Sequence, residues 1–271
     1  MHEITLLQGI LIAIMGVIVG LDAYLEALFI FRPIIVCTLT GLILGDVRTG
    51  LLAGGLVELS FAGLTPVGGT QPPNPVLAAV MTTVLAYTTG LDVKTTIGLA
   101  LPFSFLMQYI ILFYYSSFSL FVGKFDKYAA AGDTKRYAKL SNITMLIVSL
   151  SYAIVIFLCV YVAQAPMQSL VNNMPEWLTH GFGIAGGMLP AVGFGLLLKI
   201  MFKFEYTPYL IIGFIMAVFL HFSNLLPVAL VGTALAIYKY YDDIKREKEL
   251  QNIVISKSSN DLGEEEYSDG I

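Results

Sequence analysis

Long apolar runs form the first pattern along the chain. Residues 97–122 and 144–164 are runs of 26 and 21 residues, and about 20 apolar residues in a helix cross the hydrocarbon core of a bilayer. The runs 182–202 and 4–21 have comparable lengths. We expect a helix over each run, although the first, with 18 residues, could instead lie within one leaflet. It lacks an A-x-A cleavage pattern, so we expect it to remain in the mature chain.

Shorter apolar runs form the second pattern. They cover 33–45, 50–64 and 75–88, and the Pro- and Gly-rich segment 65–75 separates the last two. Irregular backbone at membrane depth is tolerated where protein or a water-filled cavity satisfies its polar groups, and broken helices mark the binding sites of transporters. These runs predict an all-α polytopic membrane protein, a transmembrane helix bundle with broken helices and re-entrant hairpins.

The distribution of Lys and Arg predicts which loops face the cytoplasm. The loop 124–139 carries five basic residues and should be cytoplasmic, whereas 165–181 carries none, holds the single tryptophan and should face outward. Both ends of the apolar run 208–238 are then cytoplasmic, yet its 31 residues fall short of the roughly 40 that two crossings need. We therefore predict a bent or re-entrant hairpin that turns near 221–224; a pair of long tilted spans is the alternative.

Composition supports a membrane protein with a charged tail. The chain is 57% hydrophobic and 13% charged, with a mean hydropathy of +0.79, against about 25% charged residues in a soluble domain. Residues 239–271 hold five basic and nine acidic residues, which account for the net charge of −4. We divide the chain into a membrane-embedded domain, 1–238, surrounded by membrane lipid, and a cytoplasmic tail, 239–271, disordered at its end. The balanced charge of the body argues against a nucleic-acid partner.

Motifs for covalent chemistry are not found in the sequence. It lacks a G-x-x-x-x-G-K-[ST] motif, and its three histidines and two cysteines form neither a metal-ligand pattern nor a Ser/His/Asp arrangement. We therefore expect no catalytic residues, no cofactor and no metal. His221 lies in the expected hairpin, where a structural role is favoured over a functional one.

Glu58 is the first candidate site residue, because it stands in the middle of the apolar run LAGGLVELSFAGL. A charged residue at the centre of a membrane helix costs roughly 2.5–3.5 kcal/mol on insertion scales and is a functional candidate for that reason. It lies seven residues before Thr65, two helical turns away on the same face, and we expect Thr65 to belong to the same substrate-binding site. The alternative is a neutral or paired carboxyl that fixes helix packing.

Gln71 and Asn74 lie in the irregular segment that follows. Their amide groups both donate and accept hydrogen bonds, as recognition of a hydroxyl-rich sugar requires. The alternative is that the loop satisfies its own polar groups, with Asn74 bonding the backbone ahead of Pro75.

Asp22 and Glu26 lie one helical turn apart near the end of the first apolar run, close to Arg32. An ion pair among these three residues and a role of Glu26 in substrate binding are both open from the sequence.

Two segments carry a family resemblance. The run FRPIIVCTLTGLILGDVRTGLLAGGLVELSFAGLTPVGGTQPPNP at 31–75 and the run HGFGIAGGMLPAVGFGLLLK at 180–199 resemble the IIC membrane subunit of the mannose/fructose/sorbose family of the bacterial sugar phosphotransferase system. Similarity extends over nearly the whole chain. It is greatest to the N-acetylgalactosamine/galactosamine type, in view of GGTQPPNP, the run 101–121 and the acidic ending EEEYSDGI.

The resemblance implies group translocation across the bacterial inner membrane. The family pairs IIC with a second membrane subunit, IID, as heterodimers in a trimer, and a mobile core moves against a scaffold as in an elevator. Phosphoryl groups pass from the general phosphocarrier protein through IIA to a phosphohistidine on IIB, so this chain would bind and pass an amino sugar without being the enzyme itself. The family's sugar site maps onto Glu58, Gln71 and Asn74, and the mannose type differs around Asn74.

Two other readings stay open. An ion-coupled secondary transporter would use Glu58 or Asp22 as its coupling carboxylate. Alternatively, the chain would be a scaffold whose sugar site resides in IID.

Overall fold

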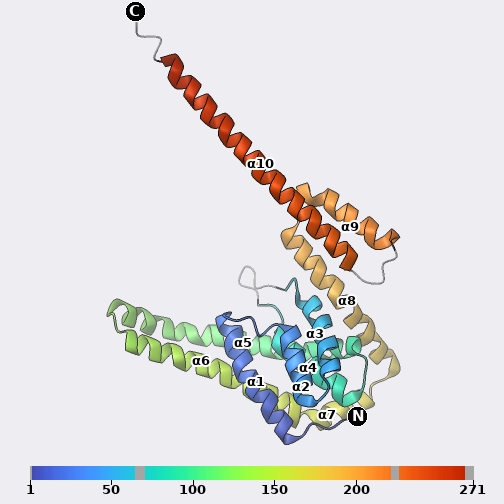
Figure 1. The fold of residues 1–271 in the computed structure, drawn as a ribbon. Coiled ribbons are helices and arrows are strands. Elements are labelled where there is room, and N and C mark those ends of the chain that lie inside the picture. Colours follow the sequence, from blue (N-terminus) through green and yellow to red (C-terminus); the bar gives the residue numbers. More distant parts are fainter. Residues whose placement is uncertain (1, 65–70, 221–225, 266–271) are drawn as a thin grey trace, which may run out of the picture. The chain divides into compact units, whose positions relative to one another are not determined.

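The computed structural model describes residues 2–64, 71–220 and 226–265, with side chains up to residue 251 except that of residue 172. Within these ranges every regular element is a helix (Figure 1). The chain forms two compact units, Met1–Met201 and Phe202–Ile271. Each is described separately below.

Four long apolar helices in the described part of the chain can cross a membrane by length and composition. They are α1 (Leu6–Leu25), α5 (Val93–Ala130), α6 (Thr134–Phe157), which continues into the π-helical turn η1 (Leu158–Val162), and α8 (Glu176–Met201). A helix over each of the four long apolar runs is thereby confirmed. The short helix α7 (Gln164–Asn172) lies between η1 and α8.

Three short helices follow α1, as the short apolar runs predicted. They are α2 (Pro33–Leu44), α3 (Val47–Phe61) and α4 (Pro75–Thr89), with 12, 15 and 15 residues. At 1.5 Å per residue each is shorter than the hydrocarbon core, which is about 30 Å thick.

Local sequence sets the ends of these short helices. Gly45, with a φ of 85°, ends α2, and the Asp46 carboxylate caps α3 by accepting from the Thr49 N–H at 3.0 Å. The hydrogen bonds from Thr49 also lower the pKa of Asp46. Pro75 occupies the first position of α4, which Asn74 caps, and Gly90, with a φ of 72°, ends that helix. Proline is favoured at the first position because the N–H it lacks would have no helical partner there. Glycine is favoured after the last position because, without a Cβ, it adopts a positive φ at little cost.

The core of the first unit is built around α4. Nearly all its side chains are buried, and it packs against α5, α2 and α3. Around it α2 packs on α3, α1 on α6, and α8 on α5 and α3. Small residues permit these close approaches: a Cβ added at Gly41 would lie 2.8 Å from the Gly50 Cα, in the contact between α2 and α3.

The second unit contains a 3-10 turn, η2 (Phe204–Tyr206), and two helices that pack on each other, α9 (Thr207–Phe219) and α10 (Leu226–Glu265). The break between the helices falls in the predicted hairpin, but the predicted turn and His221 lie outside the described residues. Helix α10 continues across position 238. The boundary between a membrane domain and a tail at that position stays a prediction.

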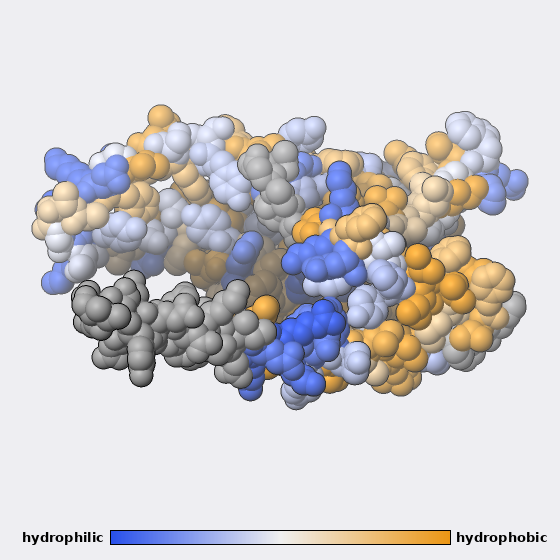
Figure 2. Space-filling view, turned by 90° about the horizontal axis from the view of Figure 1, so that it is seen from above, coloured by the Kyte–Doolittle hydropathy of each residue, from blue (hydrophilic) through white to orange (hydrophobic). Residues whose placement is uncertain are grey.

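Apolar side chains remain exposed on several helices, as Figure 2 shows by the hydrophobic residues on the surface. Examples are Leu120, Tyr109, Phe113 and Leu146, with exposed fractions of 80, 67, 67 and 64%. Such exposure suits contact with lipid or another membrane subunit, because in water it would favour aggregation.

Candidate functional site

A cavity of about 620 Å³ lies within the first unit. Its walls come from the end of α1, the connection 26–32, the starts of α2 and α4, the end of α3, the segment 71–74, and the middles of α5 and α6. The polar residues of the wall are Glu26, Arg32, Gln71 and Asn74, and the aromatic ones are Tyr24, Phe29, Phe31, Phe61, Tyr114, Tyr115 and Tyr152. The broken segment therefore borders a cavity, as its irregular backbone predicted.

Asn74 is buried, with 3% of its surface exposed, and holds three segments together. Its Oδ1 accepts from the Leu77 N–H at 3.0 Å and caps α4, while its Nδ2 donates to the Tyr152 hydroxyl at 2.7 Å. Its backbone N–H and carbonyl both bond to Ser104 of α5, at 3.2 and 2.8 Å. Asn74 therefore bonds a backbone N–H, but that of Leu77 within α4, and its amide nitrogen bonds outside the loop. A sugar contact of Asn74 stays a prediction.

Gln71 offers a different arrangement. Its backbone carbonyl accepts from the Gln108 side chain, which fixes the segment against α5. Its own side-chain amide lines the cavity and makes no hydrogen bond within the described part of the chain. Of the two amides singled out in the sequence, Gln71 is the one whose side chain remains available to a bound molecule.

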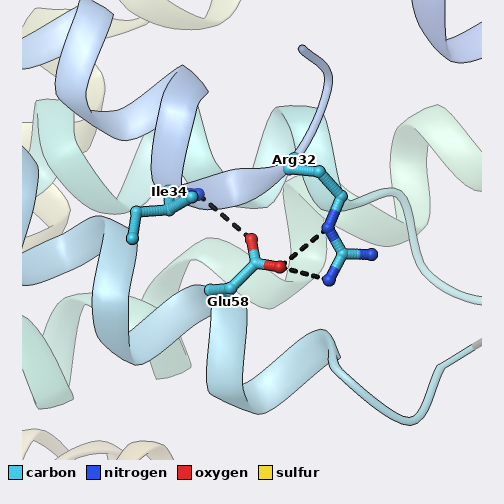
Figure 3. A network of polar contacts seen from close by, with 3 residues as sticks. All are labelled: Arg32, Ile34 and Glu58. Carbon is cyan, nitrogen blue, oxygen red and sulfur yellow. Dashed lines mark hydrogen bonds and ion pairs between the residues drawn. The ribbon is translucent and has the colours of Figure 1, made fainter. Parts of the chain in front are cut away.

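Glu58 is paired, as its alternative interpretation predicted (Figure 3). Its Oε1 accepts from the Nε of Arg32 at 2.7 Å and also from a terminal guanidinium nitrogen, and its Oε2 accepts from the Ile34 N–H at 3.2 Å. The carboxylate itself is not part of the cavity wall, whereas Arg32 is. Glu58 therefore ties the start of α2 to α3 and orients the arginine beside the cavity.

Asp22, Glu26 and Arg32 do not form the ion pair that was one of two expectations for them. Arg32 reaches across to α3 for its partner, and the Asp22 carboxylate accepts backbone N–H groups instead. Glu26 ends α1 in a left-handed conformation, lines the cavity and has no ion-pair partner among the described residues. The ion pair expected among these sequence neighbours was wrong because the connection 26–32 turns and places its backbone N–H donors nearer to the Asp22 carboxylate.

Thr65, the remaining substrate-binding candidate from the sequence, lies outside the described residues, so its role stays a prediction. Other parts of the site were not singled out in the sequence. Arg32 appeared only as a possible ion-pair partner, and the tyrosines of the wall went unnoticed. Their signal is a phenol in an otherwise apolar run, as at Tyr152 and at Tyr114–Tyr115, since a buried hydroxyl needs a partner.

The arrangement suits a neutral polyhydroxylated molecule. Ligand sites are largely apolar with a few placed polar groups that fix orientation. Aromatic rings can cover the C–H faces of a hexose, while the Glu26 carboxylate and the Gln71 amide supply hydrogen-bond partners for its hydroxyl groups. The described residues include no group of three or more His, Cys, Asp or Glu placed to hold a metal ion.

Comparison with known proteins gives consistent results. A family model described as "PTS system sorbose-specific iic component" matches residues 6–238. N-acetylgalactosamine permease IIC component 1 of Escherichia coli (strain K12) is 59% identical over 271 residues, covering all of both chains. The alignment with this relative extends over the whole chain, including the tail 239–271.

Two solved structures share the fold. One, described as a membrane protein, has a TM-score of 0.79 at 29% identity and covers 88% of this chain and 97% of its own. The other, from the mannose transporter ManYZ in complex with microcin E492, has a TM-score of 0.56 at 29% identity, covering 89% and 97%. The chain therefore belongs to the family of sorbose-type IIC components and is a multi-pass membrane transport subunit of a sugar phosphotransferase-system permease.

Proposed function

We propose that this chain is the IIC subunit that binds and translocates an amino sugar, N-acetylgalactosamine or galactosamine, and delivers it for phosphorylation during uptake. The cavity of about 620 Å³, with its aromatic walls and unpaired polar groups, is the observation that carries the proposal. The sugar class is supported by 59% identity to a relative named for N-acetylgalactosamine, against 29% to the mannose transporter chain. Mannose or sorbose specificity is the alternative within the family.

The proposed binding residues have distinct roles. Glu26 and Gln71 contact the sugar, because both line the cavity with side chains that have no partner among the described residues. Glu58 acts through Arg32, and Asn74 shapes the wall from behind. Thr65 completes the set as a prediction from sequence.

The partners follow from the organisation of the family. We propose that the chain pairs with IID in a trimer of heterodimers in the bacterial inner membrane, with its C-terminus in the cytoplasm. A core carrying the cavity moves toward the cytoplasm in the manner of an elevator, and the sugar then meets IIB. IIB, recharged by IIA, carries the phosphoryl group; the charged product is retained because a dianion has no favourable route back through apolar protein.

Uptake of labelled amino sugars tests the proposal. The chain is expressed with its IID and IIB partners in a strain lacking its own amino-sugar permeases, and Glu26→Gln is compared with Glu176→Gln, an exposed acid outside the cavity. We expect Glu26→Gln to raise KM by about tenfold, the loss of one good polar contact, and Glu176→Gln to leave it unchanged.

Glu58→Gln is the second variant in this series. It leaves the Arg32 guanidinium without its carboxylate partner beside the cavity, so we expect KM to rise here as well. Unchanged KM in both Glu26→Gln and Glu58→Gln would refute the site. Uptake that persists without IIB and collapses with an uncoupler would instead favour an ion-coupled transporter.

A further inference from the structure

The connection 26–32 between α1 and α2 supplies a large part of the cavity wall. Glu26, Phe29, Phe31 and Arg32 all lie in it and all line the cavity. Its backbone is unusual, because Glu26 and Phe29 have φ values of 49° and 58°. Positive φ is uncommon in residues other than glycine and persists where surrounding contacts enforce it.

Asp22 provides those contacts from the last turn of α1. Its side chain accepts three backbone N–H groups of the connection, from Leu28 and Ile30 at 2.7 Å each and from Phe31 at 3.3 Å. Its carbonyl accepts from the Glu26 N–H, also at 2.7 Å. The residue is 5% exposed, so these charge-assisted bonds form largely away from solvent.

A second carboxylate fixes the far end of the same connection. Glu58 holds the Arg32 side chain and the Ile34 N–H. Neither Asp22 nor Glu58 belongs to the cavity wall. The connection is therefore held between two carboxylates outside the cavity wall, while four of its own residues line the cavity.

We propose that Asp22 is a positioning residue for the sugar site, acting through the connection 26–32 without touching the sugar. This inference rests on the proposed function of the cavity. The four hydrogen bonds to Asp22 hold Glu26 and Phe29 in left-handed conformations, and these conformations set where the Glu26 carboxylate and the Phe29 ring face the bound molecule. Asparagine at position 22 keeps one acceptor oxygen but turns an amide N–H₂ toward backbone N–H donors, so the connection relaxes.

Transport kinetics of Asp22→Asn test the proposal. The control is Asp46→Asn, the same chemical change at a carboxylate that accepts a backbone N–H away from this cavity. We expect Asp22→Asn to raise KM by about tenfold, with the maximal rate per membrane-inserted IIC changed less than about twofold. The Asp46→Asn protein keeps the wild-type KM.

A double-mutant cycle separates positioning from a general structural role. Glu26→Gln is combined with Asp22→Asn. If Asp22 acts by placing Glu26, its replacement raises KM much less in the Glu26→Gln background, because residues acting as one unit are not additive. The proposal would be overturned if Asp22→Asn raised KM by the same factor in both backgrounds. It would also be overturned if KM kept its wild-type value while only the maximal rate fell.

The same measurements identify failure of the proposed function. In that case Glu26→Gln alone leaves KM unchanged, whatever Asp22→Asn does. If Asp22→Asn does not reach the membrane, Leu28→Pro serves as a second variant: it removes one donor to Asp22, and the Leu28 side chain is 74% exposed. A wild-type KM in that protein would also count against the positioning role.

Discussion

At Asn74 one side chain fulfils two structural requirements at once. Its oxygen satisfies an N–H of the first turn of α4, and its nitrogen satisfies the hydroxyl of Tyr152 on α6. Tyr152 is 2% exposed, so solvent cannot replace a lost bond. A buried donor without a partner costs about 1–3 kcal/mol, more than the net gain from forming the bond.

Replacing Tyr152 by phenylalanine isolates this bond. We expect Tyr152→Phe to lower the stability of the protein by about 1–3 kcal/mol, because the Asn74 Nδ2 loses its acceptor. Asn74→Ala should cost more, since it also removes the cap of α4, worth about 1 kcal/mol. Thermal unfolding in detergent measures both, with Tyr137→Phe, at a tyrosine that is 44% exposed, as the control. A Tyr152→Phe protein as stable as wild type would contradict this account.

At the scale of elements, glycines decide how closely α8 approaches its neighbours. A Cβ at Gly186 would lie 1.8 Å from the backbone oxygen of Lys94 on α5, and one at Gly193 would lie 2.3 Å from the backbone oxygen of Leu59 on α3. Backbone atoms cannot rotate aside as side chains do. Within the glycine-rich run 180–199, Gly186 and Gly193 therefore serve helix packing, whereas Gly181 and Gly195 have open space around them.

The adjacent pair Gly186 and Gly187 gives a matched test. Gly186→Ala should force α8 away from α5 and lower the unfolding temperature. Gly187→Ala meets only the Lys94 Cδ, at an ordinary contact distance of 3.9 Å, so it should be neutral or stabilising, because alanine favours a helix over glycine by roughly 0.5–1 kcal/mol. Melting temperatures of the two variants in the same detergent decide the point. Equal effects would mean that the contact of α5 with α8 does not depend on close backbone approach.

For the whole molecule, charge predicts orientation. The basic segment 124–139 was expected to be a loop, but it comprises the end of α5, a short turn and the start of α6. The segment 165–181, which contains no Lys or Arg, comprises most of α7 and the start of α8. Basic loops stay in the cytoplasm during insertion. The two natural cysteines, Cys37 and Cys159, are both buried, so an introduced surface cysteine can report its own side of the membrane.

Labelling with a membrane-impermeant maleimide tests the orientation. Lys135, at the start of α6, and Glu176, at the start of α8, are both exposed and lie in the two segments. We expect Glu176→Cys to react in intact spheroplasts and Lys135→Cys to react only after permeabilisation. The unsubstituted chain serves as the control for Cys37 and Cys159. The reverse pattern would place the basic loop outside and refute the predicted topology.

The sequence alone determined the features that depend on neighbouring residues. Run length predicted the long apolar helices, while the short apolar runs 33–45, 50–64 and 75–88 predicted α2, α3 and α4. These signals are local, because hydrocarbon thickness and backbone geometry act on each segment independently. The family was also recognisable from contiguous runs, since the match extends over residues 6–238.

Only the tertiary structure decided which polar groups meet. Arg32 pairs with Glu58, 26 residues away. The Asp22 carboxylate accepts backbone N–H groups of the connection 26–32 and does not pair with Arg32. Tyr152 joins the cavity wall from a helix 78 residues beyond Asn74. A polar side chain has several possible partners of similar chemistry. Which of them it contacts depends on distances that are set only when the helices pack. The cavity itself therefore could not be derived from residue order.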